Sequence, residues 1–325
     1  RQRPLGTASE AEEPEQCGKG HSEEERTETW QQERARVLAQ ARVIVVKVGS
    51  AVLTDASGLS NPVLAGLAAQ LAALRDLPVV NDPAGQPPQG ARRLVLVSSG
   101  AVAAGRAALA GRGRVVETAG LAARQAAAAV GQGQLMQAWD KVFLAHGMST
   151  AQVLLTRDDL RARQRFLNAR NTFAELLHWD VLPIVNENDT VSISELKFGD
   201  NDCLASLLVN LVEADLYINL TSSSGVLAAD PQKYPDAPVM EHIDDVATLD
   251  LGRLCGGKTL VGTGGMYSKL LAARRAAQLG VPTLILPGRE PWVISRAFAA
   301  AGVCPVPEGH EPFTRGTWVR SGRQA

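Results

Sequence analysis

Short, almost purely apolar segments alternate along the chain with longer segments of helical periodicity. Residues 42–50, "RVIVVKVGS", are rich in β-branched side chains, which is typical of a strand buried on both faces. The other expected strands lie within 93–105, 149–156, 181–189, 214–221 and 281–288, and the expected helices at 62–77, 121–143, 162–179, 203–213, 266–280 and 291–300. This alternation predicts an α/β fold, a three-layer α/β/α sandwich with a mostly parallel central sheet.

The first 38 residues differ in composition from the rest of the 325-residue chain. They are rich in Glu, Gln and Arg and poor in aliphatic side chains, so they cannot bury enough apolar surface to fold alone. We expect a disordered acidic tail at 1–38 that can become helical near 30–38. One α/β domain is expected at 39–320, followed by a C-terminal stub at 321–325.

Composition excludes several classes of protein. The net charge of −1 lacks the basic bias of nucleic-acid binding, and no apolar run reaches the roughly 18–20 residues of a membrane helix. The four cysteines form no CxxC pair, which gives no zinc spacing and fits a reducing compartment. We therefore expect a cytoplasmic protein; an organelle, after loss of a targeting segment, is the alternative.

Polar or glycine-rich residues follow four of the expected strands, at 49–50, 98–100, 186–189 and 221–224. In a parallel sheet, ligands bind at the carboxyl ends of the strands. The pattern therefore predicts a long ligand cleft at one edge of the sheet. The alternative is that these residues are ordinary polar turns.

Two lysines lie at expected anion-binding positions, one near a strand end and one at the start of an expected helix. Lys47 interrupts the first apolar run, so it either reaches a ligand at the strand end or pairs with a carboxylate. Gly49 beside it leaves room for backbone to approach a phosphate. Lys269 ends "GTGGMYSK" (262–269), whose glycines precede an expected helix N-terminus. Helix N-termini attract anions, which predicts phosphate binding here; the alternative is a flexible glycine turn before an ordinary helix.

Two carboxylates and an amide, Asp200, Asn201 and Asp202, precede the apolar helix expected at 203–213. A helix cap needs one such side chain. The other two indicate a metal, a substrate or simple solvation.

Eight stretches occur together in an order shared with one enzyme family. They are "VVKVGSAVLT", "VSSGAVAAG", "ARQAAAAVGQGQLM", "LLTRDDL", "RFLNARNT", "PIVNENDTV", "FGDNDCLAS" and "GTGGMYSK". Through them, residues 41–320 resemble the glutamate 5-kinase family, which has the amino-acid-kinase fold. The resemblance implies ATP-dependent phosphorylation of the γ-carboxylate of L-glutamate, the first step of proline biosynthesis. It also implies Mg²⁺ that is held mainly by the nucleotide phosphates.

The resemblance assigns roles to individual residues. Lys47 and Lys269 match the lysines that flank the transferred phosphoryl group, and Asp202 is expected to hold both in place. The residues expected to contact glutamate are Ser99, Asn186, Asp189, Asp200 and Asn201. Those expected to bind the nucleotide are Lys47, Gly49, Ser50, Thr221, Ser222, Thr263, Gly264, Gly265, Met266, Tyr267, Ser268 and Lys269. No protein ligand to a metal is expected. Ser222 stands where the family usually has an acidic residue beside the nucleotide. This difference concerns the affinity for nucleotide and the binding of Mg²⁺.

The resemblance further implies feedback inhibition by proline, assembly into dimers or tetramers, and a downstream glutamyl-phosphate reductase as a partner. Two alternatives remain at this point. One is another acyl kinase of the same fold, such as N-acetylglutamate kinase, and the other is a non-catalytic regulator that binds glutamate or proline. The gathered acids favour a substrate with a free ammonium group over an acetylated one.

Overall fold

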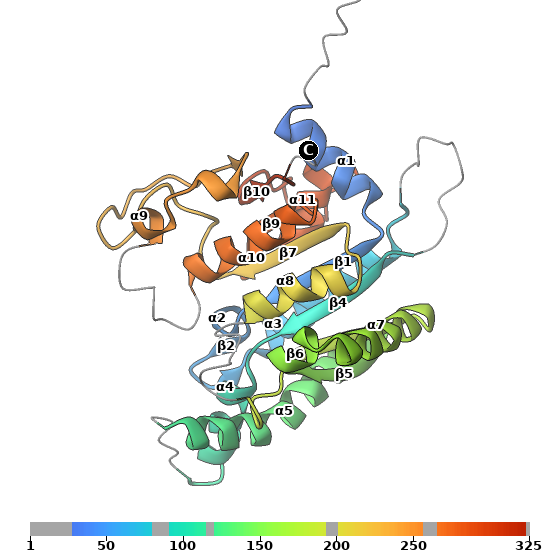
Figure 1. Ribbon diagram of the computed structural model, residues 1–325, viewed down its shortest axis with the longest axis vertical. Helices are drawn as coiled ribbons and strands as arrows, with labels where there is room; N and C mark the ends of the chain where they lie inside the picture. Colours follow the sequence, from blue (N-terminus) through green and yellow to red (C-terminus); the bar gives the residue numbers. More distant parts are fainter. Residues whose placement is uncertain (1–27, 80–90, 115–119, 193–200, 256–264, 323–325) are drawn as a thin grey trace, which may run out of the picture.

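A central sheet of eight strands organises the molecule, in the order β5-β6-β4-β1-β7-β9-β10-β8 (Figure 1). The computed structural model describes residues 28–79, 91–114, 120–192, 201–255 and 265–322. The strands of this sheet are β1 (Val43–Val48), β4 (Arg93–Ser98), β5 (Ser149–Leu155), β6 (Val181–Glu187), β7 (Leu216–Thr221), β8 (His242–Ile243), β9 (Thr283–Pro287) and β10 (Thr317–Val319). The first six in the spatial order run parallel, whereas β10 is antiparallel to β9.

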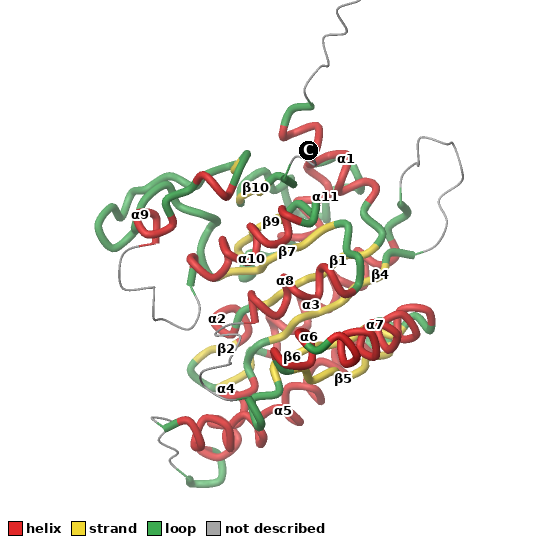
Figure 2. Tube along the Cα trace, in the orientation of Figure 1, coloured by secondary structure: helices red, strands yellow, loops and turns green. Residues whose placement is uncertain are grey.

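Helices cover both faces of this sheet, as Figure 2 shows by colour. On one face, α3 (Asn61–Asp76), α5 (Leu121–Leu144) and α11 (Val293–Ala300) share a core cluster with the strands. On the other face, α7 (Arg163–His178), α8 (Asn201–Leu211) and α10 (Met266–Gln278) share a second cluster. The predicted three-layer α/β/α sandwich is therefore confirmed.

Strand β1 shows why its apolar run has no polar alternation. Ile44, Val46 and Val48 enter the first cluster, while Val45 enters the second. Side chains alternate between the two faces of a strand. Lys47 therefore points to the same face as Val45, toward α8 and α10.

The remaining elements are short or terminal. They are α1 (Trp30–Gln40), α2 (Ser50–Leu53), β2 (Thr54–Asp55), β3 (Gly58–Leu59), α4 (Ala101–Ala110), α6 (Arg157–Arg161), the 3₁₀ turn η1 (Val246–Thr248) and α9 (Leu251–Cys255). All six predicted strands and all six predicted helices are confirmed, with α8 beginning at Asn201 rather than at residue 203. The sequence did not predict β2, β3, β8, β10 and the shortest helices. Among the helices of the described ranges, none is long and apolar enough to cross a membrane.

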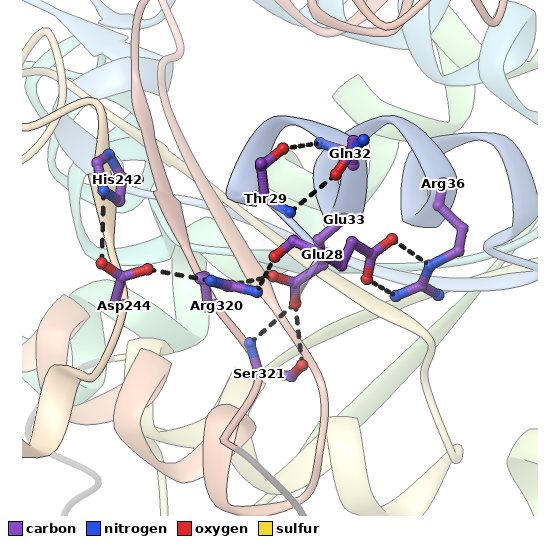
Figure 3. A network of polar contacts seen from close by, with 9 residues as sticks. All are labelled: Glu28, Thr29, Gln32, Glu33, Arg36, His242, Asp244, Arg320 and Ser321. Carbon is purple, nitrogen blue, oxygen red and sulfur yellow. Dashed lines mark hydrogen bonds and ion pairs between the residues drawn. The ribbon is translucent and has the colours of Figure 1, made fainter. Parts of the chain in front are cut away.

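The expected disordered tail does not reach residue 38, because α1 is ordered and packed against the end of the sheet (Figure 3). Glu33 is only 3% exposed, and its carboxylate accepts hydrogen bonds from Arg320 Nε at 2.6 Å and from Ser321 Oγ at 3.0 Å. Trp30 stacks on His242 of β8 at a ring-centroid distance of 4.9 Å. These contacts compensate for the polar composition of the segment; residues 1–27 lie outside the described part of the chain.

Helices α4 and α5 cross with their backbones in contact. A Cβ atom on Gly131 of α5 would overlap the carbonyl oxygen of Ala101, and one on Gly105 of α4 would overlap that of Ala127. Only glycine fits at both positions. Because α4 begins directly after Ser99 and Gly100, this crossing fixes α5 relative to the carboxyl edge of the sheet.

We expect Gly131→Ala to destabilise the protein, since the new methyl group must push two helix backbones apart. Overpacking of this kind costs about 1–3 kcal/mol. Gly133 on the same helix has open space around its Cβ position, so Gly133→Ala is the matched control. The control should instead stabilise the helix by up to about 1 kcal/mol. Urea unfolding of both variants measures this difference, and equal effects would contradict the close crossing.

Candidate functional site

A buried carboxylate joins β1, α8 and α10 at the carboxyl edge of the sheet. Lys47 Nζ lies 2.5 Å from Asp202 Oδ1, and Lys269 Nζ lies 2.9 Å from Asp202 Oδ2. Asp202 is fully buried and both lysines are nearly so. The structure therefore brings together the three residues that the sequence singled out as a catalytic group, and it excludes the alternative that Asp202 is a solvated acid.

Two further donors hold this carboxylate. Asn219 Nδ2 of β7 donates to Asp202 Oδ1 at 2.9 Å, and Ser268 Oγ donates to Asp202 Oδ2 at 2.9 Å. Asn219 pairs with Lys47 in the register of β1 and β7, so the two side chains leave the sheet side by side. Sequence analysis missed Asn219, although it interrupts "LYINLT" just as Lys47 interrupts the first strand.

The three ionised side chains of this cluster carry two positive charges and one negative charge. Two ammonium groups share one carboxylate in a region with almost no solvent exposure. A buried charge without a full counter-charge is costly. An anionic ligand such as a phosphate would add a counter-charge beside the two ammonium groups.

Such a ligand has space, because both lysines line a cavity of about 880 Å³, within the size range of small-molecule sites. The expected nucleotide-binding residues that line it are Lys47, Gly49, Ser50, Thr221, Ser222, Gly265, Met266 and Lys269. Tyr267 is not among the lining residues, and Ser268 points to Asp202 instead. Thr263 and Gly264 lie outside the described residues. Ser223, within the polar strand end predicted at 221–224, also lines the cavity, as do Asp230, Gln232 and Lys233, which sequence analysis did not single out.

The N-terminus of α10 borders the cavity through Gly265 and Met266. Gly265 has φ +115° and ψ −174°, a conformation that side-chain-bearing residues rarely adopt. Helix N-termini carry partial positive charge and free N–H groups. This end of α10 therefore adds to the positive potential that the two lysines create.

A second polar cluster lies beside the first. Asn201 Nδ2 donates to Ser99 Oγ at 2.8 Å and to Asn186 Oδ1 at 2.9 Å. Asn201 Oδ1 is buried and has no hydrogen-bond partner among the described residues. Ser99 also lines the cavity, so the two clusters adjoin. Asp189, which follows β6, is half-buried, while Asp200 lies outside the described residues.

Cys255 is another group at the cavity. Burial, together with the nearby carboxylate of Asp230, raises the pKa of its thiol to about 11. The thiol therefore stays protonated near neutral pH, and the thiolate is the form that reacts as a nucleophile or binds a metal. Across the described ranges, no three His, Cys, Asp or Glu side chains gather as a metal site.

Comparison with known proteins places this site in a family. Residues 42–287 match the model of the amino acid kinase family. The fold resembles that of a solved isopentenyl phosphate kinase, with a TM-score of 0.51 and 16% identity over 85% of this chain and 99% of that one. It also resembles UMP kinase from Bacillus anthracis, with a TM-score of 0.53 and 13% identity over 87% of this chain and 97% of that one.

Curated proteins found by sequence have a higher sequence identity to this chain than these two solved structures do. The chain is 59% identical over 291 residues to the glutamate 5-kinase of Nitratidesulfovibrio vulgaris, a match that covers 90% of this chain and 69% of the relative. It is 58% identical to the glutamate 5-kinase of Oleidesulfovibrio alaskensis over the same shares of both chains. The glutamate 5-kinase of Geobacter sulfurreducens is 46% identical over 83% of this chain and 68% of its own length. The family model and these relatives show that the chain, whose site has two lysines around one buried carboxylate, belongs to the amino acid kinase family and, within it, to the glutamate 5-kinases.

Proposed function

We propose that this protein transfers the γ-phosphoryl group of ATP to the γ-carboxylate of L-glutamate, giving L-glutamyl 5-phosphate for proline biosynthesis. The observation that carries the proposal is the buried Lys47–Asp202–Lys269 cluster, in which Asp202 holds both lysines at the lining of a cavity of ligand size. The identity to glutamate 5-kinases supports the choice of acceptor.

In this reaction the bond between the γ-phosphorus and its bridging oxygen breaks, and ADP leaves with the electron pair. A carboxylate oxygen of glutamate forms the new bond to phosphorus. The protein has to align the two substrates and neutralise charge on the phosphoryl oxygens. Lys47 and Lys269 supply the positive charges from two different elements, and Asp202 keeps both ammonium groups in place without touching substrate.

The nucleotide would lie in the cavity, with its phosphates near Gly49, Ser50 and the N-terminus of α10. Thr221, Ser222 and the segment 263–269 are proposed to contact it as well. Magnesium commonly binds substrate phosphates together with few protein oxygens. We therefore assign Mg²⁺ to the nucleotide phosphates, where it would offset their charge.

Glutamate would bind in the second polar cluster. The buried Oδ1 of Asn201 and the carboxylates of Asp189 and Asp200 are acceptors suited to the substrate ammonium group, and Ser99 and Asn186 complete the cluster. An acetylated amine has no such charge to offer them. This favours free glutamate over N-acetylglutamate as the acceptor.

Release of ADP tests the proposal, measured with L-glutamate, with N-acetyl-L-glutamate and without acceptor. We expect glutamate alone to accelerate ADP release strongly. Faster turnover of N-acetyl-L-glutamate would assign a different acyl kinase, and nucleotide binding without any turnover would indicate a regulator.

We expect Asn201→Ala to raise the KM for glutamate with little change in kcat, because the amide contacts substrate in the ground state and the transition state alike. Loss of hydrogen bonds to a charged ligand group is worth about 1.5–3 kcal/mol, or roughly 10- to 150-fold in KM. Steady-state kinetics at saturating ATP measure this change. A fall in kcat at unchanged KM would place Asn201 in the phosphoryl-transfer group instead.

Several wider features complete the proposal. The kinase domain would include α1 in addition to residues 39–320, and the enzyme would work in the cytoplasm as a dimer or tetramer alongside a glutamyl-phosphate reductase. Proline shares the ammonium and carboxylate groups of glutamate, so it would inhibit by occupying part of the site near Asp189 and Asn201. Proline inhibition that no concentration of glutamate relieves would contradict overlapping sites.

A further inference from the structure

A chain of amide side chains leads away from the second polar cluster. Asn201 Nδ2 donates to Asn186 Oδ1, Asn186 Nδ2 donates to Gln132 Oε1 at 2.9 Å, and Gln132 Nε2 donates to Gln152 Oε1 at 3.4 Å. Four elements contribute to it, namely α8, β6, α5 and β5. Asn201, Asn186 and Gln132 each donate from the NH₂ group to the next carbonyl oxygen, so the chain has one direction.

This direction determines which atom of Asn201 is free. Asn186 Oδ1 already accepts from Asn201 Nδ2 and from the backbone N–H of Glu187 at 2.9 Å. Its NH₂ group must then find an acceptor on the opposite side, and Gln132 Oε1 is that acceptor. Because Asn201 gives its NH₂ to Asn186 and Ser99, its carbonyl oxygen is left to accept from a ligand.

Removal of the Gln132 carbonyl would leave the Asn186 NH₂ group without an acceptor in a buried position, since Asn186 is 3% exposed. An unmade buried hydrogen bond is costly, so Asn186 would rotate to satisfy it. A rotated Asn186 no longer offers its oxygen to Asn201. The orientation of Asn201 Oδ1 would then be lost as well.

Helix α5 is a rigid support for this chain. Gln132 directly follows Gly131, whose backbone contacts α4 at the close crossing. Two turns before Gln132, α5 also contacts the segment that follows β6. There Gln125 Nε2 donates to the carbonyl oxygen of Ser192 at 3.0 Å. Ser192 Oγ in turn donates to Glu187 Oε1 at 2.5 Å. The segment from Asn186 to Ser192, which carries Asp189, is thus fastened to α5 at both ends.

We propose that Gln132 is a positioning residue for the glutamate site: through Asn186 it orients the carbonyl oxygen of Asn201 toward the substrate ammonium group. This inference rests on the proposed function, because it assigns Asn201 to the acceptor substrate. Gln132 itself contacts neither substrate in this account. Its effect should therefore appear in glutamate binding and should depend on Asn201.

The test is steady-state kinetics on Gln132→Met, which keeps the side-chain length and removes both hydrogen bonds. Gln132→Glu keeps an acceptor for Asn186 and is the conservative variant. Gln134→Met is the matched control, since Gln134 lies on the same helix, is exposed and has no contact with the site among the described residues. Gln132→Ala replaces Gln132→Met if the latter does not fold, because alanine keeps the helix.

We expect Gln132→Met to raise the KM for glutamate about three- to tenfold, the effect of one neutral hydrogen bond, with kcat and the KM for ATP nearly unchanged. Gln132→Glu should restore most of the affinity, and Gln134→Met should match the unchanged protein. In the double variant with Asn201→Ala, Gln132→Met should add nothing to the effect of Asn201→Ala, because residues that act through one another are not additive.

Three results would overturn the inference while leaving the proposed function intact. They are a glutamate KM in Gln132→Met equal to that of Gln134→Met, equal losses in Gln132→Met and Gln132→Glu, and full additivity with Asn201→Ala. A parallel loss of kcat and ATP affinity would assign Gln132 a purely structural role. Absence of glutamate-dependent ADP release from the unchanged chain would instead overturn the proposed function, and the inference with it.

Discussion

Lys269→Met is expected to lower kcat on the order of 10²- to 10³-fold, the range found when one preorganised donor to a transition state is removed. The side chain reaches the cavity from the first turn of α10, and its ammonium group is held by Asp202 at 2.9 Å. Charge on the phosphoryl oxygens redistributes as the bond to ADP breaks, so a cation there matters more in the transition state than in the ground state. The KM for glutamate should change little.

Lys141→Met is the matched control, because Lys141 is an exposed lysine on α5 that lines a separate hollow. It should leave both kinetic constants unchanged. If Lys269→Met raised the KM for ATP and left kcat intact, Lys269 would be a nucleotide-binding residue with no special role in the transfer step.

Asp202→Asn is expected to reduce both activity and stability. The substitution keeps the shape of the side chain but removes the carboxylate that pairs with both buried lysines, Lys47 and Lys269. Removal of one partner from a buried ion pair costs about 3–5 kcal/mol. The displaced ammonium groups should lower kcat on the order of 10²-fold, since a misplacement of about 1 Å has that effect.

Urea unfolding and steady-state kinetics measure the two effects of Asp202→Asn. Asp76→Asn is the surface control, because Asp76 is exposed and pairs only with its neighbour Arg75 among the described residues. Such surface pairs contribute about 0–1 kcal/mol. If Asp202→Asn raised the glutamate KM alone, Asp202 would belong with the substrate-binding residues. Our division of the acid–amide triplet, Asp200, Asn201 and Asp202, into substrate-binding and lysine-holding residues would then be wrong.

The sequence predicted the fold well because strands buried on both faces read as apolar runs. For the same reason, the charged Lys47 stood out within its apolar run. Asn219 is an equal anomaly, but its meaning depends on the pairing of β7 with β1, which brings it beside Lys47. The last two strands at one end of the sheet, β10 and β8, are three and two residues long, too short for a pattern to be read.

The acid–amide triplet was only partly interpretable from sequence. Asn201 and Asp202 were expected before the helix, whereas both lie in its first turn and point to different clusters. Gln132 stands in an Ala-rich helix with Gln125, Gln134 and Gln137, and composition does not distinguish them. The three-dimensional contact with Asn186 is what sets it apart. Such contacts depend on which helix face meets the sheet edge, which periodicity alone does not give.

The most direct test of the account is to trap the product. An acyl phosphate reacts with hydroxylamine to give a hydroxamate and inorganic phosphate, so the 325-residue chain is incubated with ATP, Mg²⁺, hydroxylamine and L-glutamate. We predict that ADP and glutamyl hydroxamate form in equal amounts and only when L-glutamate is present. Formation of ADP without hydroxamate, or at the same rate without L-glutamate, would contradict phosphoryl transfer to the γ-carboxylate.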